Sequence, residues 1–391
     1  MTTDRLYYRD SYLVDFSASV VETAEEGRRV YLDRTAFYPD SGGQPHDTGT
    51  IAGVAISSVV DEGDCIAHLA GAPVPPGQAA CRVDWPRRFD HMQQHSGQHL
   101  LSALLVEMFG AATVGFHLGA ESSTIDVALV SLDPPQAAAV ERRANQVVFE
   151  NRPLSVSFEE NPQGLRKPGE RSGLLRIVSI QGLDRSACGG THVRSTGEIG
   201  PVLLRKLDKA HGSLRIEFLC GARAVRRARA DYEALSGIGR LFSAPLEETP
   251  ALVAAQVQAL DASEKTRRRL ATELAGLRGG ELYLATAPNQ AGLRAVLRRL
   301  PQGATLDDEL RATAQGFTNW PKSLFLAAAP DPPTLLLATS QDAGIHAGNL
   351  LKFAVTRRGG RGGGNAQLAQ GSLPSPEALE EAVKELMPLV G

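Results

Sequence analysis

Cysteine is scarce in this sequence, and the scarcity excludes a disulfide scaffold. The 391 residues include four cysteines, and no two of them form a C-x-x-C pair. Disulfide-stabilised folds are short chains with a much higher density of cysteine. We therefore expect reduced thiols. The four positions are Cys65, Cys81, Cys188 and Cys220.

Long apolar runs and a strong charge of one sign are missing too. No run approaches the ~18 apolar residues that cross a bilayer, and the opening MTTDRLYYRDSYLVDF lacks the basic-then-apolar layout of a signal peptide. A cytoplasmic protein without membrane contact is expected. The formal net charge of -3 gives no overall basic field, so any contact with nucleic acid must come from local clusters of arginine and lysine. No G-x4-G-K-S/T loop is present, so ATP binding is not expected.

The composition that is present is typical of a folded, soluble protein of several domains. Hydrophobic residues make up 42% and charged residues 22%, with 39 glycines and 23 prolines, which excludes a disordered or fibrous chain. The length favours two or three domains.

Changes in the residue pattern divide the chain into four segments of an α+β protein. Short alternating apolar runs separated by turns predict a small, barrel-like β domain over 1–88. Helix and strand patterns mix over 89–222, which predicts an α+β core, with a hairpin of strands 201–207 and 213–220. Segment 223–280 favours a helical arm. Strands at 281–286, 323–329 and 334–339 and a helix at 375–387 predict a C-terminal α/β domain over 281–391.

The helical arm allows two interpretations. Leu246, Val253, Leu260 and Leu274 recur at multiples of seven, as in a coiled coil, but Glu264 and Arg267 interrupt the apolar positions. The alternative is a helix hairpin packed on its own domain.

Two short motifs carry the metal-binding chemistry. His95 and His99 are four apart on a predicted helix and share one face. Cys188 and His192 flank two glycines and a threonine, which permit a tight loop. Together they offer three nitrogens and one sulfur, the donor set that Zn2+ prefers. The spacing alone leaves an alternative open, because His91 precedes His95 by four residues and offers a competing pair.

Several longer stretches resemble the editing domain of alanyl-tRNA synthetases and its freestanding relatives, the AlaX proteins. These are RTAFYPDSGGQPHDTG (34–49), HMQQHSGQHLLSALL (91–105), GFHLG (115–119) and SACGGTHVRSTGEIG (186–200). A further stretch, GGRGGGNAQLAQG (359–371), resembles the C-terminal domain that alanyl-tRNA synthetases share with DHH-type phosphoesterases. The resemblance follows the order of the long AlaX form over nearly the whole chain.

The resemblance implies a zinc-dependent hydrolase that removes serine or glycine wrongly attached to tRNA(Ala). It implies one zinc per chain, held by the second histidine pair and the Cys/His pair. It also implies tRNA contacts and allows a homodimer. The metal ligands would be His95, His99, Cys188 and His192.

The other expected site residues would select the amino acid or hold a water molecule. Thr35 matches a threonine linked to amino-acid discrimination in the family. Gln94, beside the first ligand, could hold a water with its amide, and the alternative is an ordinary glutamine on the helix surface. Bacterial synthetases have a glutamine in the pocket near the position of His117. A role in the pocket therefore does not carry over directly to His117, which could equally be a histidine of the core.

RNA contacts are expected at two glycine-rich segments and at arginine clusters. Gly42 and Gly43 match the family's glycine-rich loop. A second loop, 359–364, contains Gly363, and its backbone N–H groups could approach phosphates beside the nearby arginines. These arginines are Arg357, Arg358 and Arg361, with a second cluster of Arg223, Arg226, Arg227 and Arg229 at the start of the arm.

Three other functions fit the same residues. A cysteine hydrolase would use Cys188 as a nucleophile with a nearby histidine as base. A different metallohydrolase would act on small esters without needing tRNA. A non-catalytic zinc-containing module would bind tRNA without turnover.

Overall fold

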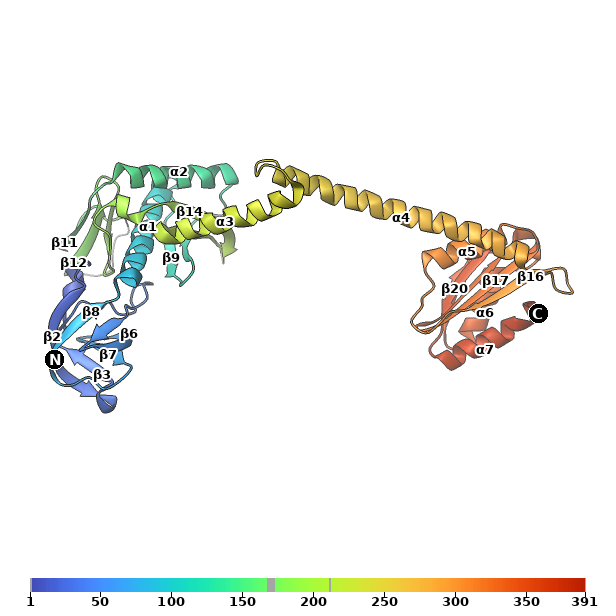
Figure 1. The fold of residues 1–391 in the computed structure, drawn as a ribbon, viewed down its shortest axis with the longest axis horizontal. Helices are drawn as coiled ribbons and strands as arrows, with labels where there is room; N and C mark the ends of the chain where they lie inside the picture. The colour runs from blue at the N-terminus through green and yellow to red at the C-terminus, as the bar shows by residue number, and fades with distance from the viewer. Residues whose placement is uncertain (1, 167–172, 211, 391) are drawn as a thin grey trace. The chain divides into compact units, whose positions relative to one another are not determined.

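The computed structural model describes residues 2–166, 173–210 and 212–390. The chain divides into two compact units, Met1–Ile238 and Gly239–Gly391 (Figure 1). The boundary lies inside the segment expected to form a helical arm. The mixed α+β class expected from the sequence is confirmed.

Six strands at the start of unit 1 close into a barrel, in the order β2-β3-β7-β6-β5-β8. Alternate side chains of these strands point inward and form one apolar cluster that includes Leu32, Ile51 and Ile66. The strands are β2 (Asp15–Ala24), β3 (Arg29–Leu32), β5 (Gly49–Ile51), β6 (Val54–Glu62), β7 (Cys65–Ala70) and β8 (Gly77–Val83). A short parallel pair, β1 (Asp4–Arg5) and β4 (Arg34–Thr35), lies outside this barrel.

Helix α1 (Trp85–Phe109) follows the barrel directly. Asp84 caps its first turn by accepting a hydrogen bond from the Arg87 backbone N–H, and Gly110 ends it in the left-handed conformation. Its middle is buried even where it is polar, from His91 to Ser102. The buried Arg88 guanidinium joins the helix to the barrel loop by an ion pair with Asp47. Buried polar side chains require partners, and the partners of two of these histidines form the candidate site.

The rest of unit 1 surrounds α1 with helices and two antiparallel sheets. One sheet has the order β14-β15-β10-β9 and the other β11-β12-β13. The predicted hairpin is confirmed by the pairing of β14 with β15, although His211 of its turn lies outside the described residues. The elements are β9 (Thr113–Leu118), β10 (Ser123–Val127), α2 (Pro134–Glu150), β11 (Leu154–Glu160), β12 (Leu174–Ile180), β13 (Asp184–Ala187), β14 (Val202–Ala210), β15 (Ser213–Cys220) and α3 (Gly221–Phe242).

Unit 2 is a five-stranded sheet, β16-β17-β18-β20-β19, with helices on both faces. Helices α6 and α7 share one apolar cluster with the sheet, and α4 and α5 share the other (Figure 1). The elements are α4 (Thr249–Ala285), β16 (Arg294–Arg299), α5 (Asp308–Thr318), β17 (Ser323–Pro330), β18 (Pro333–Thr339), α6 (Ala347–Thr356), β19 (Arg361–Gly364), β20 (Leu368–Ser372) and α7 (Pro376–Leu386).

Two local predictions in unit 2 are wrong. The expected strand 281–286 lies largely in α4, which continues to Ala285. Helix α4 continues through Gly279, where a Cβ would stand 2.1 Å from the Thr313 carbonyl oxygen of α5. The glycine therefore allows α4 and α5 to pack closely and does not end the helix. The expected loop 359–364 is mostly strand β19, paired antiparallel with β20. Among the described residues, no helix has the length and apolar content needed to cross a membrane.

Candidate metal centre

Four side chains from two distant segments meet beside the barrel. His95 and His99 lie one turn apart on the buried part of α1, and Cys188 and His192 lie in the loop that follows β13. One ligand atom from each residue lies within 4.8 Å of every other. This is the group that the sequence predicted, and its donor atoms could hold a metal ion.

Two of the imidazoles direct their Nε2 atoms at the cysteine sulfur. The Cys188 Sγ lies 3.4 Å from His95 Nε2 and 3.4 Å from His192 Nε2. Each histidine has an outer polar partner at Nδ1 instead: Gln44 Oε1 for His95 at 2.8 Å, Asp184 Oδ2 for His99 at 3.1 Å, and Ser96 Oγ for His192 at 3.1 Å. A hydrogen bond from Nδ1–H fixes the tautomer whose Nε2 carries a lone pair, as metal binding requires.

Gln44 connects the two halves of the group. Its Oε1 accepts hydrogen bonds from His95 Nδ1 and from the Thr191 backbone N–H, and its Nε2 donates to the Thr191 hydroxyl at 2.8 Å. The side chain is 1% exposed. Gly42 and Gly43, both with positive φ, form the turn that precedes Gln44. The structure gives these glycines a role in placing Gln44, and their RNA contact stays a prediction.

The second glycine of the Cys/His loop is required by close contact with the helix. A Cβ at Gly190 would lie 2.2 Å from His95 Cε1. The loop backbone therefore passes directly over the first histidine, which brings Cys188 to the helix. Phe116 of β9 covers another side of His95, with ring centroids 5.4 Å apart in a stacked arrangement.

Charge is concentrated at the sulfur. Burial opposes ionisation of the Cys188 thiol, but His95 and His192 outweigh it and hold the pKa of Cys188 well below its usual value. Burial also lowers the pKa of His192, to about 3. For His99, burial is outweighed by the bond to Asp184 and by the nearby cysteine, which raise its pKa to about 9. The centre therefore favours a thiolate, the form of cysteine that binds metals.

Thr35 lies on β4 and its hydroxyl contacts His68 of the barrel strand β7. Its hydroxyl lies 2.9 Å from His68 Nε2 and accepts a hydrogen bond from the Phe37 backbone N–H at 3.1 Å. His68 Nδ1 lies 3.1 Å from the Val30 carbonyl oxygen, which can only accept, so Nδ1 carries the proton. The Thr35 hydroxyl must then donate to His68 Nε2, and one lone pair remains on its oxygen.

The other predicted residues of unit 1 lie in different surroundings. The Gln94 amide is buried and bonded at both ends to the backbone of Cys220, donating to its carbonyl at 3.0 Å and accepting from its N–H at 2.9 Å. The structure thus gives Gln94 a structural contact, and its catalytic role stays a prediction. His117 is exposed on β9. His91 is buried but is not part of the four-residue group.

The arginines expected to contact RNA differ in their exposure and in whether they form ion pairs within the protein. Arg357 and Arg361 are exposed, as is Gly363. Arg358 is held by ion pairs with Glu385 and Glu381 on α7. In the other cluster, the expectation that Arg223 projects from the arm is wrong, because its guanidinium is buried against Asp90.

Sequence reasoning missed the outer partners of the histidines. Gln44 follows the two glycines of the quoted Gly-Gly motif, and Ser96 stands between the two histidines, so both were visible without being selected. Asp184 lies four residues before Cys188, but nothing local assigns a buried aspartate to His99.

Comparisons with known proteins find two family models that match parts of this chain. The family model described as "Threonyl and Alanyl tRNA synthetase second additional domain" matches residues 175–217, and the model "DHHA1 domain" matches residues 323–390. The solved C-Ala domain of Aquifex aeolicus alanyl-tRNA synthetase matches 25% of this chain and 91% of its own, at 25% identity and a TM-score of 0.21.

Two groups of curated relatives align with the chain. The alanine–tRNA ligase of Pyrococcus furiosus is 30% identical over 98% of this chain, but the match spans 43% of the ligase, so the chain covers less than half of such relatives. The alanyl-tRNA editing protein Aarsd1 of Mus musculus is 31% identical over 69% of this chain and 71% of its own. The chain belongs to the family of alanyl-tRNA editing proteins.

Proposed function

We propose that this protein is a zinc-dependent aminoacyl-tRNA hydrolase that removes serine or glycine from mischarged tRNA(Ala). The observation that supports it is the four-residue group, in which His95 and His192 turn Nε2 toward Cys188, in a member of the alanyl-tRNA editing family.

The residues fit zinc by donor type and by spacing. With Zn–S near ~2.3 Å and Zn–N near ~2.0 Å, a tetrahedral site has sulfur-to-nitrogen edges of about 3.5 Å. The two Sγ to Nε2 distances of 3.4 Å match that edge. Three nitrogens with one thiolate exclude the oxygen-preferring Mg2+ and Ca2+. When bound, zinc would supply a positive charge that polarises an ester carbonyl or a water molecule.

The chain's own residues hold this chemistry in place. Gln44 and Asp184 can only accept at these atoms, so they keep Nδ1 of His95 and His99 protonated, and the Ser96 hydroxyl holds Nδ1 of His192. Phe116 covers one side of His95. Such fixed positioning reduces the reorganisation that a reacting ester would otherwise require.

Thr35 is the proposed selector for serine. The Thr35 hydroxyl donates its proton to His68 Nε2. Its oxygen can therefore accept a hydrogen bond from a serine hydroxyl but cannot donate one to it. Alanine has no such hydroxyl and gains nothing there. A synthetase pocket rejects an added hydroxyl by only roughly 100-fold, so a second site with the opposite preference is needed.

One assay tests the proposal. Ser-tRNA(Ala) and Gly-tRNA(Ala) are incubated with the wild-type protein, with the Cys188→Ala variant and with chelator-treated protein, and release of the amino acid is followed. We expect hydrolysis by the wild type, loss in the other two, and recovery when zinc is restored to the chelated sample. Chelator-resistant activity with a trapped acyl-thioester would instead indicate a cysteine hydrolase. Binding of tRNA without turnover would indicate a non-catalytic module.

A further inference from the structure

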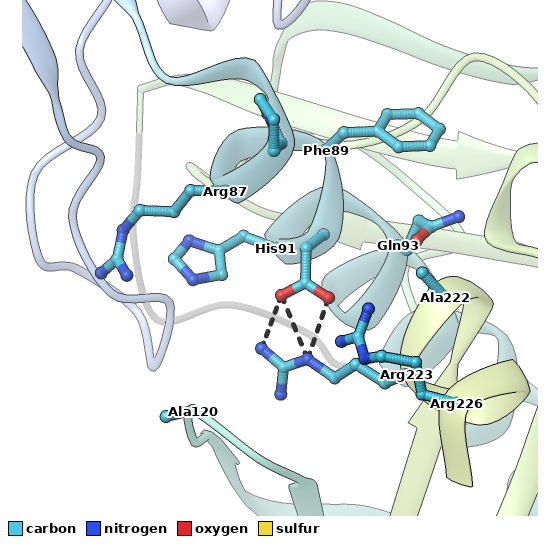
Figure 2. A pocket seen from close by; sticks show the side chains of 10 residues that line it. Arg87, Phe89, His91, Gln93, Ala120, Ala222, Arg223 and Arg226 are labelled. Atoms are coloured by element: carbon cyan, nitrogen blue, oxygen red, sulfur yellow. Dashed lines mark hydrogen bonds and ion pairs between the residues drawn. The ribbon is translucent and has the colours of Figure 1, made fainter. Parts of the chain in front are cut away.

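A cavity of about 480 Å3 opens at the start of α1, on the side facing α3 (Figure 2). Its lining includes side chains from the first two turns of α1 and from the first turns of α3. It lies outside the four-residue metal group, and none of the ligands lines it. The residues that matter here are Arg87, Phe89, Asp90, His91, Arg223 and Arg226.

His91 lines this cavity and carries an unpaired polar atom. The residue is 4% exposed, and its Nδ1 has no hydrogen-bond partner among the described residues. Every other buried histidine described has a polar partner at Nδ1. A buried polar atom without a partner costs roughly 1 to 3 kcal/mol, so a ligand that supplies the partner is favoured. Burial, with Arg87 beside it, lowers the pKa of His91 to about 4, so the ring is neutral.

The cavity also holds two cations that are not neutralised. Arg223 is paired with Asp90 through three hydrogen bonds, so the charges of this pair cancel (Figure 2). Arg87 uses only its Nε, which donates to the His46 carbonyl oxygen at 2.9 Å. Arg226 forms no ion pair among the described residues. Two guanidinium groups in one cavity bind phosphate oxygens well, because their forked N–H groups match that geometry.

An aromatic ring completes the lining. Phe89 is half-buried, and its ring lies 5.2 Å from that of Trp85, at an interplanar angle of 32°. Aromatic rings beside basic side chains are the means by which proteins bind single-stranded RNA, through stacking on a base and contact with its phosphate.

We propose that this cavity binds a phosphorylated nucleotide of the single-stranded acceptor end of tRNA. The phosphate would lie between Arg87 and Arg226, the base against Phe89, and a polar group of the nucleotide at His91 Nδ1. This rests on the proposed function. His91 precedes the ligand His95 by four residues, about 6 Å along the helix, so a nucleotide here would lie beside the candidate metal centre.

The proposal can be tested with two ester substrates, one with phosphate groups and one without. One is Ser-tRNA(Ala), and the other is 3′-O-seryl adenosine, which has the ester but no phosphate. We expect Arg87→Gln and Arg226→Gln each to lower kcat/KM for the tRNA roughly tenfold and to leave seryl adenosine unchanged. Arg142→Gln is the matched control, because Arg142 is exposed on α2 and has no ion pair within the described residues. Equal losses on both substrates, or no loss on the tRNA, would overturn the proposal.

Binding of uncharged tRNA keeps this test separate from the proposed hydrolysis. If the wild type cleaves neither ester, the proposed function fails, but the cavity can still be judged from affinity. Each arginine variant should then weaken binding roughly tenfold and reduce the slope of log affinity against log salt by about 0.7. Affinities equal to the wild type would contradict the site. Adenosine 5′-monophosphate should displace tRNA better than inorganic phosphate does, and equal displacement would indicate an anion site without nucleotide recognition.

His91 separates a binding role from a structural one. His91→Leu removes the unpaired nitrogen, so the thermal unfolding temperature should not fall, whereas tRNA affinity should fall roughly fivefold. A lower unfolding temperature with unchanged affinity would mean that His91 only packs the helix.

Discussion

Asp184 lies behind His99, with its Oδ2 3.1 Å from the histidine Nδ1, and its other oxygen is held by the Arg166 guanidinium at 2.8 Å. The carboxylate is fully buried, and despite that burial its bonds to His99 and Arg166 lower its pKa to about 2. A charged carboxylate behind a metal-binding imidazole fixes the ring and makes its free nitrogen a better ligand.

Replacing Asp184 should therefore weaken metal binding. We expect Asp184→Asn to lower zinc affinity roughly 10- to 100-fold, measured by competition with a chromophoric chelator. Asp126→Asn is the control, because Asp126 pairs with Arg215 in a more exposed salt bridge. Equal zinc affinities for the two variants would show that Asp184 does not act through His99.

Gln44 should be needed for both metal affinity and stability. In Gln44→Ala, His95 Nδ1 and the Thr191 N–H both lose their acceptor, and each buried unpaired group costs roughly 1 to 3 kcal/mol. Gln44→Glu keeps an acceptor oxygen for both groups. We expect zinc affinity to fall at least tenfold in the alanine variant and to be largely recovered in the glutamate variant. Chelator competition and chemical unfolding measure the two effects, and similar behaviour of both variants would refute the acceptor role.

Thr35 should control selectivity more than rate. We expect Thr35→Val to lower the preference for Ser-tRNA(Ala) over Ala-tRNA(Ala) roughly tenfold, because one hydrogen bond to serine is lost. The two deacylation rates are measured side by side in one preparation. Thr50→Val, at a partly buried barrel threonine of β5, is the control. An unchanged selectivity ratio would remove Thr35 from the mechanism.

The barrel should lose stability in acid because of His68. Burial lowers the pKa of His68 to about 4, from an unfolded value of 6.5. The folded protein therefore favours the neutral His68 ring. The stability that this preference gives is complete above pH ~6.5 and is lost as the pH falls toward ~4. The full loss is roughly 3 kcal/mol. Titration of the histidine ring protons by NMR should show His68 unprotonated at pH ~5, and an ordinary midpoint near ~6.5 would contradict this.

The exposed arginines of unit 2 should contribute to tRNA binding. The double variant Arg357→Gln/Arg361→Gln should weaken tRNA binding and reduce the salt slope by about 1 to 2, without changing the cleavage rate at saturating substrate. Arg298→Gln is the control, because Arg298 is exposed on β16 in the same unit. A double variant with the wild-type salt slope would exclude this surface.

Local sequence patterns predicted some parts of the fold well and others poorly. The hairpin β14–β15 and the strands β17 and β18 of unit 2 have apolar runs bounded by turn residues, so they were predictable. The glycines near 279 and 362 were not, because a glycine that ends an element and one that allows close packing look the same in the sequence. Only the neighbouring helix or strand distinguishes the two.

The sequence by itself determined the family to which the chain belongs. Two short motifs offered the donors of His95, His99, Cys188 and His192, and the family resemblance, not the spacing, set the competing His91 aside. The tertiary structure alone decided which polar partners hold those imidazoles. Gln44, Ser96 and Asp184 are 51, 96 and 85 residues from their histidines along the chain. A hydrogen bond between such distant groups leaves no periodicity in the sequence, because it exists only once the barrel, the helix and the loop have packed together.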